Sequence, residues 1–565
     1  MSSGLITGND LERQKLMPPR KQRNLISEVS FNKTLIRYVI PLGYHSVIFP
    51  YILFLNKYTL IICCQTMRIH FIKTVIFIFS LGSCILSSSF AQTGKVYDIV
   101  LSGGRVIDPE TKLDAVKNIG ISNNRIAEIS SAALKGKDHI DVTGLVVSPG
   151  FIDLHIHGRD NQVQEYQLHD GVTTALELEW GIENLKEWYD TRKSKALINY
   201  GASVNWPFER FRAMDRYNER FKQSVQTTLS GESNLETLFK TIGSSYTDTL
   251  NKEEMLKTIQ NIKESLNAGG IGIGLPVGYL PKTRSDELFR LFQLAAELNV
   301  LVFSHVREPN ILSIQEAISN AAMTGASLHL VHINSMSLGK IGLALDMIKS
   351  ANEKGIDIST ELYSYTAAST LLNSAFFDEG WQDRLGISYS DLQWVATGER
   401  LTEESFSRYR KSGGTVIIHM MKPEWIKTGI SHPDVMIASD GMPYSPLAHP
   451  RTAGTFSRVL GKYVREEKVI SLNEAIEKMT LLPARRLENI APMMRFKGRI
   501  QVGTDADITI FDPMTVSDQA SFEKGLKFSK GIKHVLVNGE FVLKNGETVK
   551  NVFAGQAVFG KFKKL

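Results

Sequence analysis

The chain has 565 residues, of which 43% are hydrophobic and 22% are charged, a composition typical of globular proteins. This composition excludes a disordered chain, a collagen-like chain and a coiled coil. The net charge of +6 originates in the first 91 residues, which hold ten basic and three acidic residues, so the rest, with 55 basic and 56 acidic residues, is nearly neutral. A nearly neutral body without a clustered basic face argues against nucleic acid as a partner.

The N-terminal region has the features of a secretory leader that begins at an internal methionine. Met67 is followed by the basic residues Arg68 and Lys73, by an apolar run over 74–86 and by a small-residue cleavage site that ends at Ala91. We therefore expect 67–91 to be a signal peptide, the mature protein to be secreted or periplasmic, and 1–66 to be a non-native upstream extension.

Two alternatives remain for this region. The apolar stretch 38–63 could instead be a membrane anchor, and Cys84 could be a lipoprotein anchoring site. The apolar run within 67–91 is short for a transmembrane span, so we expect no stable membrane span in the mature form. All three cysteines precede residue 92, so the body can hold neither a disulfide nor a thiolate metal ligand.

Short β-rich runs separated by turn residues mark both ends of the body. Between 98 and 147 such runs alternate with turns such as Gly103-Gly104 and Asn123-Asn124, and the same texture returns at 506–511 and 535–539. The two ends, 92–148 and 490–565, are predicted to pair into one small β-sandwich.

Between these ends, strand-like and helical stretches alternate over 149–489. Helical periodicity is clear in 285–298, 311–324 and 472–487, and strand-like runs cover 301–303, 328–332 and 435–438. Alternation over this length favours an α/β fold with a parallel (β/α)8 barrel. Because chemistry in such barrels lies at the carboxyl ends of the strands, polar residues at the ends of apolar runs are the candidates for function.

Histidines stand at several of these predicted strand ends. His155 and His157 are two residues apart on a strand, so their side chains project from the same face. His305 and His332 each close an apolar run. Any one of them could be structural, but imidazoles that converge at strand ends are typical ligands of a divalent metal ion. His329 has the opposite parity from His332 and is interpreted as structural.

Two carboxylates lie inside the apolar strand 172–180. Glu177 and Glu179 share one face of this strand, where a carboxylate is costly unless it is paired or bound to a metal. A carboxylate that bridges two divalent ions would explain one of them. We favour Glu179, which is nearer the strand end, with Glu177 as the alternative.

Asp440 closes another apolar run and is followed by Gly441. Near a metal-bound water, such an acid can accept a proton and later donate it to a leaving amine. An N-cap aspartate of a helix is the alternative interpretation.

Together these residues resemble the amidohydrolase superfamily. The opening Gly-Phe-Ile-Asp-Leu-His-Ile-His at 150–157, the strand-end His305 and His332 and the late Asp440 carry the resemblance. Within the superfamily, the chain resembles the D-aminoacylase (N-acyl-D-amino-acid deacylase) family at 363–370, 449–456, 458–465 and 498–513.

The resemblance implies a zinc-dependent hydrolase, with one or two Zn²⁺ ions, that cleaves an amide. By position, His155, His157, His305 and His332 resemble the family's metal ligands and Asp440 its catalytic acid/base. The residues that resemble its substrate-binding groups are Arg451, which would hold the substrate carboxylate, with Tyr363 and Ser369 as neighbours. Arg307, just past His305, is a further candidate for the pocket.

One departure from the family concerns the ligand on the Gly-Val-Thr-Thr strand. D-aminoacylases usually carry a cysteine at its end, whereas this chain has Glu177-Leu178-Glu179-Trp180. A carboxylate oxygen is a harder ligand than a thiolate, so metal preference and occupancy can differ.

The expected reaction is hydrolysis of an N-acyl amino acid, of D configuration by the resemblance, or of a short peptide. In this scheme metal-activated water attacks the amide and Asp440 transfers the proton to the departing amine. A cyclic amidase or a D- or isoaspartyl dipeptidase would use the same site. A metal-free, non-catalytic relative acting as a scaffold is the alternative of another class, and the retained histidines argue against it. No oligomeric state is predicted.

Overall fold

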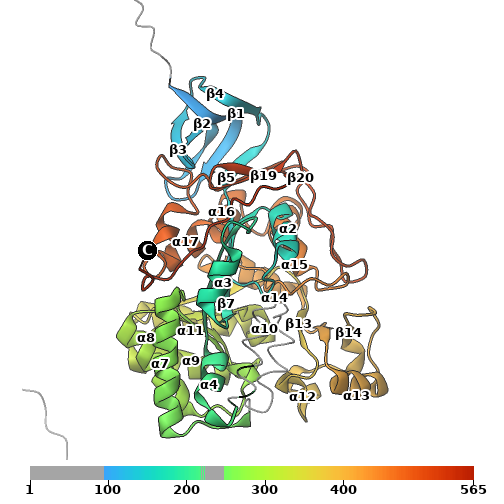
Figure 1. Cartoon of the computed structure of the whole chain (residues 1–565). Coiled ribbons are helices and arrows are strands. Elements are labelled where there is room, and N and C mark those ends of the chain that lie inside the picture. The colour runs from blue at the N-terminus through green and yellow to red at the C-terminus, as the bar shows by residue number, and fades with distance from the viewer. Residues whose placement is uncertain (1–94, 218, 220–221, 223–246, 565) are drawn as a thin grey trace, which may run out of the picture. The chain divides into compact units, whose positions relative to one another are not determined.

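The computed structural model describes residues 95–217, 219, 222 and 247–564 (Figure 1). The predicted upstream extension at 1–66, the signal peptide at 67–91 and Cys84 lie outside the described residues. Within the described part of the chain, no helix combines the length and the hydrophobicity that crossing a bilayer requires.

Eight parallel strands form a nearly closed barrel, which confirms the predicted α/β class. Their order is β16-β12-β11-β10-β9-β8-β7-β6. Between the first and last of these, Ile156 pairs with Gly441, and the His157 N–H donates to the Gly441 carbonyl at 2.7 Å. The strands are β6 (Phe151–Asp153), β7 (Val172–Ile182), β8 (Asn199–Asn205), β9 (Ile273–Pro276), β10 (Leu301–His305), β11 (Ser327–Leu330), β12 (Ile358–Leu362) and β16 (Val435–Ile437).

Helices alternate with these strands along the chain. The helix α8 shows why: Leu288, Leu291, Phe292 and Ala295 recur at helical spacing and are buried, and the helix ends where Asn299 adopts a left-handed backbone. The principal helices of the barrel are α2 (Asn161–His169), α3 (Leu185–Arg192), α4 (Trp206–Ala213), α7 (Lys252–Ala268), α8 (Ser285–Leu298), α9 (Ile311–Thr324), α11 (Ile341–Glu353) and α14 (Pro423–Ser431).

The last helical region differs from its prediction in one respect. The helix predicted over 472–487 is two helices, α16 (Leu472–Met479) and α17 (Leu481–Leu487). They meet at Thr480, whose φ of −134° and ψ of −70° are not helical. Hydrophobic periodicity continues across this break because residues of both helices are buried, so the sequence pattern does not reveal it.

Both ends of the described chain contribute to one nine-stranded mixed sheet, as predicted for the β-rich termini. Its central strand β5 (Val146–Pro149) lies between β1 (Val96–Asp108) and β17 (Ile508–Phe511), so that Val147 pairs with Val106 on one side and with Ile510 on the other. The remaining strands are β2 (Leu113–Ser122), β3 (Arg125–Ser130), β4 (Lys135–Asp141), β18 (Ile532–Val537), β19 (Glu540–Lys544) and β20 (Glu547–Thr548). The exact domain limits proposed from the sequence stay a prediction.

A small antiparallel sheet is inserted between β12 and β16. It has the order β13-β15-β14 and comprises β13 (Ala368–Leu371), β14 (Leu392–Trp394) and β15 (Thr415–Ile418). The sequence interpretation did not include this sheet. It matters for function because Ser369, Thr370 and Ile418 line the same cavity as the barrel's strand-end histidines.

Candidate metal and catalytic site

The structure gathers the predicted strand-end residues at one mouth of the barrel. His155 and His157 follow β6, Glu179 lies in β7, and His305 is the last residue of β10. His332 and Asp440 follow β11 and β16. All of these side chains are buried. Residues that are up to 285 positions apart in sequence therefore meet because the carboxyl ends of parallel strands converge.

One group of ligand atoms comprises His155 Nε2, His157 Nε2, Glu179 Oε2 and Asp440 Oδ1. His157 Nε2 lies 3.3 Å from His155 Nε2, from Glu179 Oε2 and from Asp440 Oδ1. His155 Nε2 lies 2.6 Å from Glu179 Oε2 and 3.6 Å from Asp440 Oδ1. Tetrahedral coordination with ligand bonds of about 2.0–2.1 Å separates the ligands by roughly 3.3 Å. Four of these five distances, 3.3–3.6 Å, are close to that value, whereas the 2.6 Å between His155 Nε2 and Glu179 Oε2 is a hydrogen-bond distance that a bound ion would lengthen.

A second group comprises Glu179, His305 and His332. Glu179 Oε1 lies 2.6 Å from His305 Nδ1 and 3.8 Å from His332 Nε2. Because Glu179 Oε2 belongs to the first group, this one carboxylate connects the two groups, as a bridging ligand between two ions would.

Glu177 has a different position, so the structure separates the two carboxylates of β7. Its Oε2 lies 3.0 Å from His157 Nδ1, on the side of the ring that faces away from the cluster, and its Oε1 accepts the Trp180 backbone N–H at 3.2 Å. Glu177 can therefore orient His157 without joining either group of ligand atoms.

Sequence reasoning missed a matching carboxylate, Glu361 of β12. Its Oε1 lies 2.6 Å from His155 Nδ1, so it holds His155 as Glu177 holds His157. The available signal was a single acid near the carboxyl end of a short strand, two residues before Tyr363, but the strand sequence Ile-Ser-Thr-Glu-Leu is less apolar than the one that carries Glu177 and Glu179.

The electrostatics of the cluster favour a cation. Burial disfavours a charged His155, but the carboxylates of Asp440, Glu361 and Glu179 outweigh it and raise the pKa of that imidazole well above its usual value. Burial similarly opposes the ionised form of Glu179, yet the adjacent His305 and His155 hold its pKa well below the usual range. So many carboxylates in a buried space require positive charge, which a divalent ion supplies.

The donor set also fits zinc. Four imidazoles and a bridging carboxylate are nitrogen and oxygen ligands that Zn²⁺ accepts. His305 and His332 face Glu179 with Nδ1 and Nε2, respectively, and the opposite nitrogen of each ring is buried without a hydrogen-bond partner among the described residues. The residues that would hold one or two ions are His155, His157, Glu179, His305 and His332, with Asp440 Oδ1 at ligand distance in the first group.

Two residues of the site have left-handed backbones. His332 has φ of 32° and Asp440 has φ of 50°, and they lie two residues past the end of β11 and three residues past the end of β16, respectively. Such conformations cost about 1–3 kcal/mol for residues other than glycine, and they concentrate at functional sites. They turn these two side chains toward the cluster at the point where their strands end.

Arg451 lies next to Asp440 and begins α15 (Arg451–Arg458). Its Nη2 is 2.9 Å from Asp440 Oδ1, and its guanidinium lies over the Tyr363 ring, 4.5 Å from the ring centroid. The Nη1 and Nε groups of Arg451 and the Tyr363 hydroxyl are buried without a hydrogen-bond partner in the described chain. These donors form a buried place for an anion beside the predicted acid/base.

His449 supports Arg451 and was also missed. Its Nε2–H donates to the Ala367 carbonyl at 2.9 Å, while its Nδ1 accepts the Arg451 backbone N–H at 3.1 Å. Burial and the Arg451 charge hold the pKa of His449 well below its usual value, so the ring is neutral. The sequence signal that could have identified His449 was its position in the motif 449–456.

The two other predicted pocket residues have different positions. Ser369 lines the cavity of the site and donates its hydroxyl to the Val416 carbonyl at 3.0 Å. Arg307 is not among the lining residues. Its guanidinium binds Glu316 and the carbonyls of Pro281 and Thr283, which holds it away from the cluster.

The walls of the cavity above the cluster are largely apolar. Tyr279, which sequence reasoning missed, lies against His305 with ring centroids 5.0 Å apart, and its hydroxyl is 2.8 Å from Thr370 Oγ1. No lysine or arginine is among the described residues that line this cavity, and Arg451 and Tyr363 lie outside the lining, next to Asp440, which does line it. Its apolar lining residues are Met336, Ala368, Phe376, Ile418, Met420 and Met442.

Comparison with known proteins agrees with the resemblance noted from the sequence. A sequence model described as "Amidohydrolase family" matches residues 146–542. N-acyl-D-glutamate deacylase from Alcaligenes xylosoxydans xylosoxydans is 29% identical over 470 residues, covering 78% of this chain and 93% of that protein. D-aminoacylase from the same organism is 28% identical over 476 residues, covering 78% and 94%.

A solved structure has the same fold. The crystal structure of N-acyl-D-glutamate deacylase from Bordetella bronchiseptica, complexed with zinc and a phosphonate inhibitor, matches with a TM-score of 0.68 at 24% identity. The match covers 82% of this chain and 100% of that chain.

Proposed function

This chain belongs to the amidohydrolase family, and we propose that it hydrolyses the amide bond of N-acyl amino acids, of D configuration, at the cluster of His155, His157, Glu179, His305 and His332. The D configuration is inferred from the activities by which the similar deacylases are named. Zinc, which the Bordetella relative binds, fits the donor set, and when bound it would acidify water and polarise the scissile carbonyl.

Asp440 carries the proton transfers in this proposal. Its carboxylate lies at the cluster, 3.3 Å from His157 Nε2, and can accept a proton from the attacking water. The water oxygen forms a bond to the carbonyl carbon, the C–N bond breaks, and Asp440 returns the proton to the departing nitrogen. The products are the carboxylate of the acyl group and the free amino acid.

The Asp440–Arg451 contact is the single observation that carries the proposal of an α-amino acid substrate. Asp440 must reach the leaving nitrogen, and Arg451, only 2.9 Å from Asp440, has buried donors free to hold a carboxylate. In an N-acyl α-amino acid, the nitrogen and the carboxylate are separated by one carbon atom. An amide whose carboxylate lies this close to its scissile nitrogen matches the short distance between Asp440 and Arg451. The Tyr363 hydroxyl offers a further donor to the carboxylate.

The apolar cavity walls extend the proposal to the side chain of the substrate. Arg451 lies outside the lining and is assigned to the α-carboxylate, and no described lysine or arginine lines the cavity itself, so a second carboxylate there would be buried without a cationic partner. We therefore assign this chain an apolar amino acid side chain, unlike the D-glutamate in the name of the relative from Alcaligenes. A secreted or periplasmic location of the mature protein is proposed from the leader sequence alone.

Amino acid release by the purified full chain, loaded with zinc, tests the function. We expect N-acetyl-D-methionine to be hydrolysed at least about 100-fold faster than its L enantiomer, and N-acetyl-D-methionine amide, which lacks the carboxylate, to be a poor substrate. Hydantoins and D- or isoaspartyl dipeptides form the comparison set. Hydrolysis confined to that set, or no hydrolysis of any N-acyl amino acid, would contradict the proposal.

A further inference from the structure

His329, which the sequence suggested to be structural, belongs to a line of hydrogen bonds that reaches the metal cluster. His329 Nε2 lies 3.3 Å from Glu361 Oε2, and Glu361 Oε1 lies 2.6 Å from His155 Nδ1. On its other side, His329 Nδ1 lies 2.7 Å from Ser359 Oγ. The line follows from strand register, because His329 of β11 pairs with Ser359 of β12 and Glu361 follows two residues later on the same face.

The chemistry of these groups fixes the direction of every hydrogen bond. An ionised carboxylate only accepts, so both His155 Nδ1 and His329 Nε2 must donate to Glu361. A neutral His329 that donates through Nε2 then accepts through Nδ1, and the donor there is the Ser359 hydroxyl. His155 is thereby left with its Nε2 lone pair directed at the cluster, which is the tautomer that a metal ligand requires.

The two cluster histidines after β6 are held differently. Glu177, which orients His157, is itself held by the backbone N–H of Trp180, which a side-chain substitution does not remove. Glu361, which orients His155, accepts a second bond at Oε1 from the His332 N–H at 3.2 Å, but its Oε2 bond comes from the His329 side chain. His329 is buried, and it touches none of the ligand atoms of the cluster.

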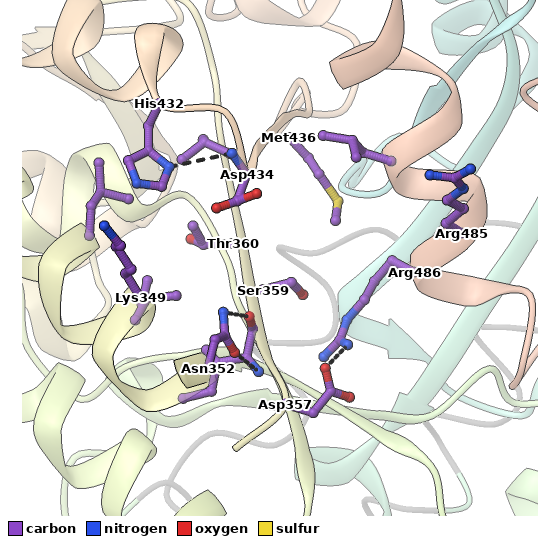
Figure 2. Close-up of a pocket in the computed structure, with 15 residues that line it drawn as sticks. Lys349, Asn352, Asp357, Ser359, Thr360, His432, Asp434, Met436, Arg485 and Arg486 are labelled. Atoms are coloured by element: carbon purple, nitrogen blue, oxygen red, sulfur yellow. Dashed lines mark hydrogen bonds and ion pairs between the residues drawn. The ribbon is translucent and has the colours of Figure 1, made fainter. Parts of the chain in front are cut away.

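The far end of the line reaches a separate cavity. Ser359 lines a space of about 360 Å³ near the amino ends of β12 and β16, together with Thr360 and the Arg486–Asp357 ion pair (Figure 2). Ser359 is half-buried there and does not line the substrate cavity, so a substitution at this position leaves the lining of that cavity unchanged.

We propose that His329 is a positioning residue for the metal centre: oriented by Ser359, it fixes the Glu361 carboxylate and through it the tautomer and orientation of His155. This inference rests on the metal site of the proposed function but not on the identity of its substrate. Residues that fix the outer nitrogen of a histidine ligand typically contribute about 10–100-fold to metal affinity.

Zinc affinity of the full chain, measured by competition with a chromophoric chelator, tests the role without reference to activity. We expect His329→Leu to weaken zinc binding by about 10-fold, the lower end of this range, because Glu361 and not His329 contacts the outer nitrogen of His155. His329→Gln should remain within about threefold of wild type, because the glutamine amide can donate to Glu361 from a similar position. Ser359→Ala should weaken zinc binding by an intermediate factor, since His329 then loses the donor that selects its tautomer.

Thr360→Val is the matched control. Thr360 is the next residue of the same strand, lines the same cavity and donates its hydroxyl to the Leu330 carbonyl at 2.7 Å, away from the line. It should lower the thermal midpoint of the metal-free protein and leave zinc affinity unchanged. Wild-type zinc affinity in His329→Leu would overturn the proposal, and so would equal weakening of zinc binding in Thr360→Val and Ser359→Ala. If His329→Leu does not fold, the comparison of Ser359→Ala with Thr360→Val still tests the proposal.

The outcomes also separate this inference from the proposed function. If the wild-type chain binds zinc but hydrolyses no N-acyl amino acid, only the proposed substrate is wrong and the affinities above still decide the role of His329. If the wild-type chain binds no divalent metal, both proposals fail.

Discussion

Asp440 and Arg451 form a buried ion pair in which Oδ1 of the carboxylate lies 2.9 Å from Nη2 of the guanidinium. Burial opposes the ionised form of Asp440, but Arg451 and His155 outweigh it and keep the pKa of the carboxyl below its usual value. The group proposed to accept protons is thus held ionised by the group proposed to bind the substrate carboxylate, so binding and proton transfer share one contact.

Asp440→Asn should abolish most turnover and leave the metal in place. The asparagine keeps the shape and can still accept from Arg451, but it cannot take up a proton, so we expect kcat to fall by about 10²–10⁴. The other ligands remain, so the zinc content measured by atomic absorption should equal that of the wild type. Asp434→Asn, an exposed residue before β16, is the control. An active Asp440→Asn enzyme would exclude this residue as the acid/base.

Glu179→Gln and Glu177→Gln should separate the two carboxylates of β7. Glu179 joins both groups of ligand atoms, so its neutral amide should reduce the number of zinc ions bound per chain. Among the cluster histidines, Glu177 hydrogen-bonds only the outer nitrogen of His157, so its variant should keep the stoichiometry and lose about 10–100-fold in affinity. Isothermal titration calorimetry with zinc measures both the stoichiometry and the affinity of binding. The reverse result would make Glu177 the bridging ligand.

The apolar walls predict that this chain prefers an apolar side chain to the D-glutamate in the name of the relative from Alcaligenes. N-acetyl-D-methionine should exceed N-acetyl-D-glutamate in kcat/KM by at least about 100-fold, since the second carboxylate would be buried without a partner. Met420→Lys, which places a cation on the wall, should narrow this ratio. Met323→Lys, at an exposed position of α9, should not. Preference of the wild type for the glutamate substrate would contradict the assignment.

His449 predicts an acid-side loss of stability. Folded His449 is neutral because its pKa is held well below 6.5, whereas the unfolded chain takes up a proton there as the pH falls below 6.5. The free energy of unfolding therefore has its full value, as far as His449 is concerned, above pH 6.5. It decreases by up to about 1.4 kcal/mol per pH unit as the pH falls below 6.5. Urea unfolding of wild type and His449→Asn, at equal zinc concentration, measures the difference in slope. Parallel profiles between pH 6.5 and pH 5 would show that His449 is protonated in the folded state.

The sequence allowed the strand-end residues of the cluster to be predicted because their signal is local. His155 and His157 are separated by one residue, and His305 and Asp440 each end an apolar run, so strand periodicity alone places them at the barrel mouth. The bridging role favoured for Glu179 agrees with its position in both groups of ligand atoms.

The supporting contacts could not be predicted because they depend on how distant strands close the barrel. His155 and Glu361 are 206 residues apart, and their contact depends on the barrel's closure and on rotamers that no local pattern encodes. His329 appeared structural because its parity differs from that of His332, but the strand ends at Leu330 and the left-handed turn at His332 breaks the alternation on which that argument depended. Arg307 was placed in the pocket by its proximity to His305 in sequence, whereas Glu316 binds its guanidinium elsewhere.

The position of β5 between β1 and β17 constrains how the protein can be made. Val147 has one neighbouring strand 41 residues earlier and the other 363 residues later, so the growing polypeptide carries an open inner edge until residues 508–511 have been synthesised. Until then the hydrophobic cluster that contains Ile119 and Val142 also lacks Ile508 and Ile510. An open edge of this kind invites pairing with other chains, so a product that terminates early should aggregate rather than accumulate as a folded barrel.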